Sequence, residues 1–119
     1  MARILFVDDD PFTLEMLNKS VQIFGHQAIL ANTGEQALAL SKSESPDLIL
    51  TDMCLPDMDG LHLLKNLKQT PATKEISVII LSASPELDVA ELTQSAGAKE
   101  YLLKPGRLQT LQEVIEKYT

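Results

Sequence analysis

Four short apolar runs without alternating polar residues restrict the fold of this chain more than any other feature. They lie at residues 4–7, 48–50, 78–81 and 101–103. A strand with one face in water alternates apolar and polar residues, whereas a strand of a parallel sheet is covered on both faces and is apolar throughout. The runs therefore predict a buried parallel sheet, to which residues 28–31 add a weaker fifth strand.

Amphipathic stretches between the runs predict helices. Leu14, Leu17 and Val21 have the spacing of one helical face, and Leu111 and Ile115 repeat that spacing near the C-terminus. Strict alternation of strand and helix indicates an α/β fold, an open doubly wound sheet of five parallel strands with helices on both faces. With proline and glycine as boundaries, the helices are expected at residues 11–24, 34–44, 60–69, 85–96 and 107–117.

Local signals mark several helix starts. Thr33 and Gln36 have the spacing of a capping box. Asp10 directly precedes a proline, as an N-cap precedes the first helical residue, so we assign it to a helix start and not to a ligand set. Asp57 and Asp59 are assigned in a similar way to the turn and the cap before the third helix.

The length and the charge of the chain limit its class. A length of 119 residues predicts one domain, residues 1–119. Ten Lys and Arg residues against 17 Asp and Glu residues give a net charge of -7, which disfavours direct binding to nucleic acid. No apolar run approaches the roughly 20 residues of a membrane-spanning helix, and the N-terminus does not resemble a secretory signal. We therefore expect a cytoplasmic protein without a membrane partner, and the single cysteine, Cys54, excludes an internal disulfide bond.

Polar residues stand directly after the predicted strands. Asp8 and Asp9 follow the first apolar run, and Asp52, Ser82 and Lys104 follow the later ones. Parallel strands end at the same edge of a sheet, where open α/β sheets bind their ligands, so we expect these residues to lie together. Like charges about 4 Å apart repel by roughly 4 kcal/mol at an effective dielectric near 20. Since Lys104 offsets one charge only, the remaining charge favours Mg²⁺, with Mn²⁺ as an alternative.

A phosphoryl group fits the other polar residues at this edge. A serine hydroxyl and a lysine ammonium beside a cation form a cradle for an anion. The sequence has neither of the glycine-rich loops, G-x-G-x-x-G and G-x-x-x-x-G-K, that bind nucleotide phosphates. The most economical hypothesis is that a carboxylate of the chain itself accepts the phosphoryl group and becomes an acyl phosphate.

Five segments resemble, in order and in spacing, the receiver domain of two-component response regulators, the CheY-like family. The segments are 4–10, 46–52, 55–60, 80–83 and 101–105, and together they span essentially the whole chain. The resemblance implies a flavodoxin-like sheet with the strand order 2-1-3-4-5, in which the first and third strands are neighbours.

The resemblance also implies roles for individual residues. Asp52 would be the phosphoacceptor, and a histidine kinase or a histidine phosphotransfer protein would be the donor. Asp8 and Asp9, together with Asp52 and the backbone carbonyl of Cys54, would bind the Mg²⁺ ion. Lys104 would pair with the phosphoryl oxygens.

Further residues would respond to the phosphoryl group. The resemblance implies that Ser82 hydrogen-bonds one phosphoryl oxygen and that Tyr101 changes position with it. The side chains of Cys54 and Ser84 would flank the group. Because neither side chain orients water as a carboxylate or an amide could, we expect slow self-dephosphorylation.

The chain departs from the family at the start of the last helix. Gly106 and Arg107 stand where the family has a phenylalanine and a helix-capping residue. We therefore expect a loosely held helix start. Because the resemblance places the output surface on the fourth helix, the fifth strand and the fifth helix, this departure bears on the choice of partner. The resemblance also implies a cis peptide bond between Lys104 and Pro105.

These inferences favour a phosphorylation-controlled switch over an enzyme with turnover. Its partners would be the phosphodonor protein and a downstream effector protein or domain, and a phosphorylation-dependent dimer is a further expectation. Two alternatives stay open. A phosphatase of the haloacid dehalogenase type would use Asp8 and Asp10, although Pro11 and Phe12 break its usual continuation. A scaffold that keeps only the fold would have no reason to retain the clustered acids.

Overall fold

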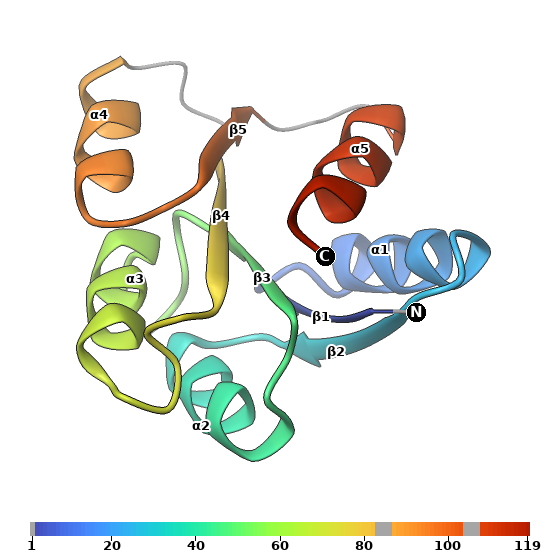
Figure 1. Cartoon of the computed structure of the whole chain (residues 1–119), viewed down its shortest axis with the longest axis horizontal. Helices are drawn as coiled ribbons and strands as arrows, with labels where there is room; N and C mark the ends of the chain where they lie inside the picture. The colour runs from blue at the N-terminus through green and yellow to red at the C-terminus, as the bar shows by residue number, and fades with distance from the viewer. Residues whose placement is uncertain (1, 83–86, 104–107) are drawn as a thin grey trace.

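Five parallel strands form a single sheet between two layers of helices, with α1 and α5 on one face and α2, α3 and α4 on the other (Figure 1). The computed structural model describes residues 2–82, 87–103 and 108–119. The strands are β1 (Arg3–Val7), β2 (Gln27–Ala31), β3 (Leu48–Asp52), β4 (Ser77–Ser82) and β5 (Glu100–Leu103). The helices are α1 (Pro11–Ile23), α2 (Gly34–Glu44), α3 (Gly60–Gln69), α4 (Leu87–Ser95) and α5 (Leu108–Tyr118). The sheet has the order β2-β1-β3-β4-β5, which confirms the predicted doubly wound α/β topology.

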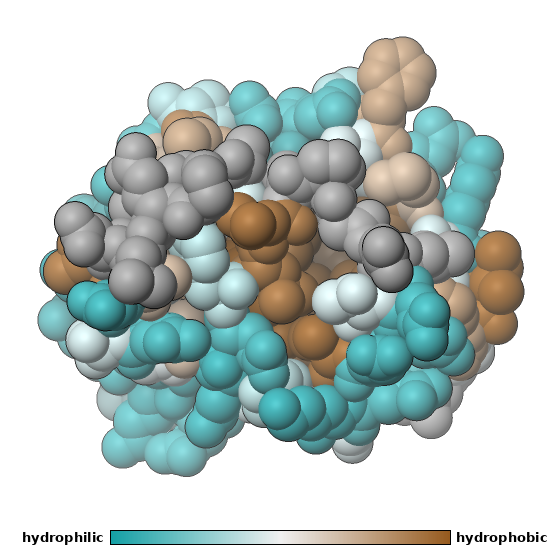
Figure 2. All heavy atoms as spheres, turned by 90° about the horizontal axis from the view of Figure 1, so that it is seen from above, coloured by the Kyte–Doolittle hydropathy of each residue, from teal (hydrophilic) through white to brown (hydrophobic). Residues whose placement is uncertain are grey.

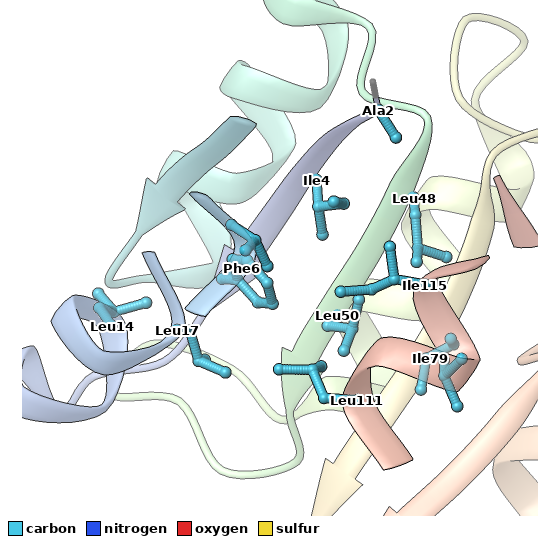
Figure 3. Close-up of a cluster of buried hydrophobic side chains, with 12 residues drawn as sticks. Ala2, Ile4, Phe6, Leu14, Leu17, Leu48, Leu50, Ile79, Leu111 and Ile115 are labelled. Atoms are coloured by element: carbon cyan, nitrogen blue, oxygen red, sulfur yellow. The ribbon is translucent and has the colours of Figure 1, made fainter. Parts of the chain in front are cut away.

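The alternating side chains of β1 explain why the apolar runs are continuous. Ile4 and Phe6 point to the face covered by α1 and α5, where they share a cluster with Leu50 and Ile115 (Figure 3). Leu5, between them in the strand, belongs to the cluster on the opposite face, under α2 and α3. All five side chains are at most 1% exposed. Since burying one such side chain contributes about 1.5–3 kcal/mol, both layers hold the sheet firmly.

Side-chain caps fix where α1 and α2 begin. Asp10 is the N-cap of α1, and its Oδ1 accepts a hydrogen bond from the amide of Phe12 at 3.1 Å. At α2, Thr33 Oγ1 accepts from the amide of Gln36 at 3.0 Å, and Gln36 Oε1 accepts from the amide of Asn32 at 2.8 Å. The predicted N-caps Asp10 and Thr33 are thus confirmed, whereas the return hydrogen bond of the predicted capping box reaches the amide of Asn32, one residue before the cap, and not the amide of Thr33. Each such cap stabilises a helix by about 1 kcal/mol.

The surface combines apolar and hydrophilic areas. On the face seen from above, apolar side chains are visible in a hollow, with hydrophilic side chains on its lower side (Figure 2). None of the helices in the described part of the chain is long and apolar enough to cross a membrane. The large apolar side chains are mostly buried in the two clusters on either face of the sheet.

Candidate functional site

The strand register brings three carboxylates together at the carboxyl edge of the sheet. Val7 of β1 pairs with Thr51 of β3, and Asp8 and Asp52 directly follow these two residues. Asp8, Asp9 and Asp52 each offer a carboxylate oxygen, and these oxygens lie within 4.8 Å of one another. We name these three residues the acid cluster. The structure therefore brings together the aspartates whose convergence the parallel sheet predicts.

The three carboxylates differ in exposure. Asp8 is 2% exposed, whereas Asp52 is half-buried and Asp9 is exposed. Asp8 Oδ1 accepts a hydrogen bond from the amide of Asp10 at 2.9 Å, and Asp52 Oδ1 accepts one from the amide of Cys54 at 3.5 Å. Burial of a charge is unfavourable unless hydrogen bonds or an opposite charge stabilise it. Asp8 is thus held in place by the backbone, while Asp9 and Asp52 remain accessible to solvent.

The ligand set of the acid cluster fits a hard divalent cation. Mg²⁺ is bound in proteins by carboxylate oxygens and retains several waters. Three carboxylates supply both the oxygens and the negative charge. Without a cation, a pair of like charges 4 Å apart is destabilised by about 1 kcal/mol in water and about 4 kcal/mol at an effective dielectric of 20. Cys54 is exposed next to the cluster, and the contribution of its backbone carbonyl stays a prediction.

Ser82 ends β4 beside the acid cluster. Asp52 pairs with Leu81 in the sheet, and Ser82 is the next residue of that strand. Ser82 is 4% exposed and pairs with Leu103, the last residue of β5. Tyr101 lies two residues earlier in β5 and is half-buried against the apolar cluster under α2 and α3. The ends of β3, β4 and β5 therefore lie side by side, as the expected convergence requires.

Several predictions concern residues outside the described ranges. They are the pairing of Lys104 with a phosphoryl group, its cis peptide bond to Pro105, the place of Ser84, and the helix start at Gly106 and Arg107. All of them stay predictions.

Gly60 permits a close approach of α3 to the backbone at Asp52. A Cβ atom at Gly60 would lie 2.7 Å from the carbonyl oxygen of Asp52 and 2.9 Å from the Cα of Met53. The amide of Gly60 also donates a hydrogen bond to the carbonyl of Met53 at 2.6 Å. Sequence reasoning missed this role, because the Asp59-Gly60 pair indicates a turn without showing what the turn contacts. Gly60 thus determines where the backbone of Asp52 can lie.

Asp57 lies in the turn before α3, as predicted, but its side chain has partners that the prediction did not include. Asp59 is the N-cap of α3, as predicted, and accepts from the amide of His62 at 2.7 Å. The side chain of Asp57, however, caps α2: it accepts from the amides of Gly34 at 2.8 Å and Glu35 at 2.9 Å. These hydrogen bonds, that from Gly34 foremost, hold the pKa of the Asp57 carboxyl below its ordinary value. The partners lie 22 and 23 residues away, so no local pattern could reveal them.

Comparison with known proteins identifies the family. The chain matches the response regulator receiver domain over residues 4–116. It is 34% identical to Protein PilH of Pseudomonas aeruginosa over 115 residues, and this match covers 97% of this chain and 95% of that protein. It is 36% identical over 116 residues to Sporulation initiation phosphotransferase F of Bacillus subtilis, covering 98% and 92% of the two chains. The chain therefore belongs to the response regulator receiver domain family.

A solved structure agrees with this assignment. The receiver domain of the sensor histidine kinase PA1611 from Pseudomonas aeruginosa PAO1, with a magnesium ion coordinated in its active site cleft, superimposes with a TM-score of 0.89. The two sequences are 26% identical, and the match covers 98% of this chain and 96% of the other. Receiver domains of two-component systems are phosphoacceptor switches and not turnover enzymes, and they bind Mg²⁺ at an acidic site.

Proposed function

We propose that this chain is a signalling switch in which Asp52 accepts a phosphoryl group from a histidine kinase or a histidine phosphotransfer protein. The observation that carries the proposal is the acid cluster, whose carboxylate oxygens lie within 4.8 Å of one another at the strand ends of a receiver domain. In this proposal Asp8, Asp9, Asp52 and the backbone carbonyl of Cys54 hold one Mg²⁺ ion. The magnesium ion in the active site cleft of the receiver domain described above supports a magnesium site in this family, and the choice of ligands is part of the proposal.

The proposed step is a phosphoryl transfer to an oxygen of Asp52. A carboxylate oxygen attacks the phosphorus of a phosphohistidine, the nitrogen–phosphorus bond breaks, and its electron pair returns to the imidazole of the donor. The product is an acyl phosphate on Asp52. A divalent cation held by Asp8, Asp9 and Asp52 would neutralise part of the negative charge of the phosphoryl oxygens. The half-buried position of Asp52 suits such a reaction, because the donor side chain must reach it.

The residues at the ends of β4 and β5 would convert phosphorylation into a change of partner binding. The Ser82 hydroxyl would donate a hydrogen bond to one phosphoryl oxygen, and the Lys104 ammonium would pair with another. Ser82 is buried at the end of the strand next to Asp52, which supports its part. Tyr101 would shift with Ser82, since it lies half-buried on the neighbouring strand. An effector protein or domain would then bind the altered surface.

The experiment is phosphorylation with acetyl phosphate and Mg²⁺, followed by mass spectrometry of the intact chain. The wild type is expected to gain one phosphoryl group, and Asp52→Asn none. Asp47→Asn is the matched control, because Asp47 is an exposed aspartate at the opposite end of β3. It should be labelled like the wild type.

Labelling that persists in Asp52→Asn would move the acceptor to another residue. A wild-type chain that responds neither to acetyl phosphate nor to beryllofluoride would contradict the proposal and favour the scaffold alternative. Steady release of phosphate from p-nitrophenyl phosphate would favour the phosphatase alternative.

A further inference from the structure

Asp57 joins the loop between β3 and α3 to the start of α2. We name residues 53–59 the 53–59 loop. The two carboxylate oxygens of Asp57 accept hydrogen bonds from the amides of Gly34 at 2.8 Å and Glu35 at 2.9 Å. These amides belong to the first turn of α2, whose N–H groups have no partner within the helix. Because a negative charge is favourable at this end of a helix, the contact holds the loop against α2.

An apolar contact lies beside this charged one. Met58 packs so closely on Gly34 that a Cβ atom there would be 2.4 Å from the Cγ of Met58. Within the loop, the amide of Leu55 donates to the carbonyl of Met58 at 3.2 Å. The tip of the 53–59 loop is therefore fixed to α2 by two side chains that are neighbours in the sequence.

The base of the same loop contacts the acid cluster. The amide of Cys54 donates to Asp52 Oδ1 at 3.5 Å, and Cys54 forms an antiparallel bridge with Asp59. The amide of Gly60 donates to the carbonyl of Met53 at 2.6 Å. The loop is thus short and held both at its base and at its tip, so only a few residues separate the contact with α2 from the backbone of Cys54.

We propose that Asp57 is a positioning residue for the divalent cation. By tying the 53–59 loop to α2, it keeps the backbone carbonyl of Cys54 in place before the cation binds. The inference rests on the proposed function, because only that proposal assigns this carbonyl to the cation. A loop already ordered loses less conformational entropy on binding, and this raises the affinity. Partners that orient metal ligands typically change metal affinity by 10- to 100-fold, and we expect about tenfold here because Asp57 orients one ligand of several.

The test separates loop positioning from ordinary helix capping. Thr33→Ala is the matched control, because Thr33 caps the same helix through the amide of Gln36 and is not part of the 53–59 loop. For the wild type, Asp57→Ala and Thr33→Ala, the Mg²⁺ dissociation constant is measured by calorimetry without a phosphodonor, and the unfolding temperature is measured in EDTA. Both variants should unfold at a lower temperature than the wild type. Asp57→Ala alone should raise the Mg²⁺ dissociation constant, by about tenfold.

Asp57→Asn keeps the shape of the side chain and one acceptor oxygen. It should weaken Mg²⁺ binding less than Asp57→Ala, and it carries the test if the alanine variant does not fold. Unchanged Mg²⁺ affinity in the Asp57 variants would overturn the inference and leave the proposed function intact. An equal loss of affinity in Thr33→Ala would also overturn it, because the effect would then be one of helix stability. A wild-type chain that does not bind Mg²⁺ would contradict the proposed function itself.

Discussion

The acid cluster and the start of β5 both present carboxylates at strand ends, but they place these carboxylates in opposite surroundings. In the acid cluster, the oxygens of Asp8, Asp9 and Asp52 lie within 4.8 Å of one another, so like charges face each other. At the start of β5, the single carboxylate of Glu100 accepts hydrogen bonds from the Tyr118 hydroxyl and, at 3.1 Å, from the Lys117 ammonium. A carboxylate that faces a cation and a hydroxyl stabilises the fold, whereas the repulsion among clustered carboxylates is relieved when a cation binds.

The electrostatics of the Glu100 group follow from these contacts. The hydrogen bond from Tyr118, and then the one from Lys117, hold the pKa of the Glu100 carboxyl below its ordinary value. The same contact with Glu100 raises the pKa of the Tyr118 hydroxyl, and it raises the pKa of Lys117 as well. At neutral pH these shifts favour an ionised Glu100, a protonated Lys117 and a protonated Tyr118 hydroxyl. In this state the hydrogen bonds between the three side chains join α5 to β5. This is a structural role that needs no bound ligand.

The largest expected difference between the two regions is the response to Mg²⁺. At about 100 times its dissociation constant, Mg²⁺ should raise the free energy of unfolding of the wild type by about 2.7 kcal/mol. Asp9→Asn should lose most of this gain, because it removes one proposed ligand and one charge. Glu100→Gln should keep the full gain. Denaturation in Mg²⁺ and in EDTA measures these differences. If Mg²⁺ stabilised Asp9→Asn as much as the wild type, Asp9 would not take part in binding the ion.

The next largest effect concerns the backbone of the acid cluster. Gly60→Ala places a Cβ atom 2.7 Å from the carbonyl oxygen of Asp52, so it should destabilise the fold by about 2 kcal/mol and also weaken Mg²⁺ binding. Gly25→Ala is the control, since Gly25 has a φ of 86° with no atom within 4 Å of a Cβ atom. It should cost about 1–2 kcal/mol through backbone strain alone and leave Mg²⁺ binding unchanged. Normal Mg²⁺ affinity in Gly60→Ala would show that the loop adapts without moving Asp52.

The sequence allowed the fold and the acid cluster to be predicted, because both depend on local patterns. Continuous apolar runs such as the one containing Phe6 indicate burial on both faces, and alternation with helices then requires a parallel sheet. Once the resemblance supplies the strand order, residues that follow the first and third strands must meet. This is why the convergence of Asp8 and Asp52 could be predicted before any contact was known.

Contacts between distant segments could not be predicted in this way. The hydrogen bonds from Gly34 and Glu35 to Asp57, and those from α5 to Glu100, join elements whose distance depends on packing. Asp57 also follows a proline in a turn-rich segment, where an aspartate is commonly a local cap. The same local interpretation holds for Asp59, which does cap its own helix, so the pattern alone cannot separate the two.

In the absence of Mg²⁺, Asp9→Asn is expected to stabilise the fold, whereas in the presence of Mg²⁺ it is less stabilised than the wild type. In EDTA, Asp9→Asn should raise the free energy of unfolding by about 1 kcal/mol, because the exposed Asp9 repels its neighbours at the high-dielectric end of the range. Glu100→Gln should lower it by about 0.5–1 kcal/mol through a weakened hydrogen bond. Added salt should reduce the first change, since it screens exposed charges. If both variants lower stability in EDTA, the acids of the cluster do not repel one another in the free protein.

The smallest effect tests the Glu100 group through pH. Tyr118→Phe removes the hydrogen bond that lowers the pKa of Glu100 most, and at neutral pH it should lower the free energy of unfolding by about 0.5–1 kcal/mol. Because the pKa of Glu100 is lowered in the folded state, this carboxyl stabilises the fold at pH values above its ordinary pKa of 4.5. That stabilisation is lost as the pH falls through the lower pKa of the folded state. Because the pKa of the Tyr118 hydroxyl is raised in the folded state, this group stabilises the fold at pH values below its ordinary pKa of 10.0. That stabilisation is lost as the pH rises through the higher pKa of the folded state.

The difference in the free energy of unfolding between the wild type and Tyr118→Phe should therefore be largest at pH values between the ordinary pKa values of Glu100 and Tyr118. It should become smaller toward both acid and alkaline pH. Urea denaturation at a series of pH values measures it, and the titration of the other carboxyls cancels because both proteins contain them. Lys117, the other charged group facing Glu100, stays protonated through the acidic half of this range, so it does not produce the acidic narrowing. A difference that is constant with pH would mean that the hydroxyl contributes only through packing, and the contrast between the two regions would then rest on the acid cluster alone.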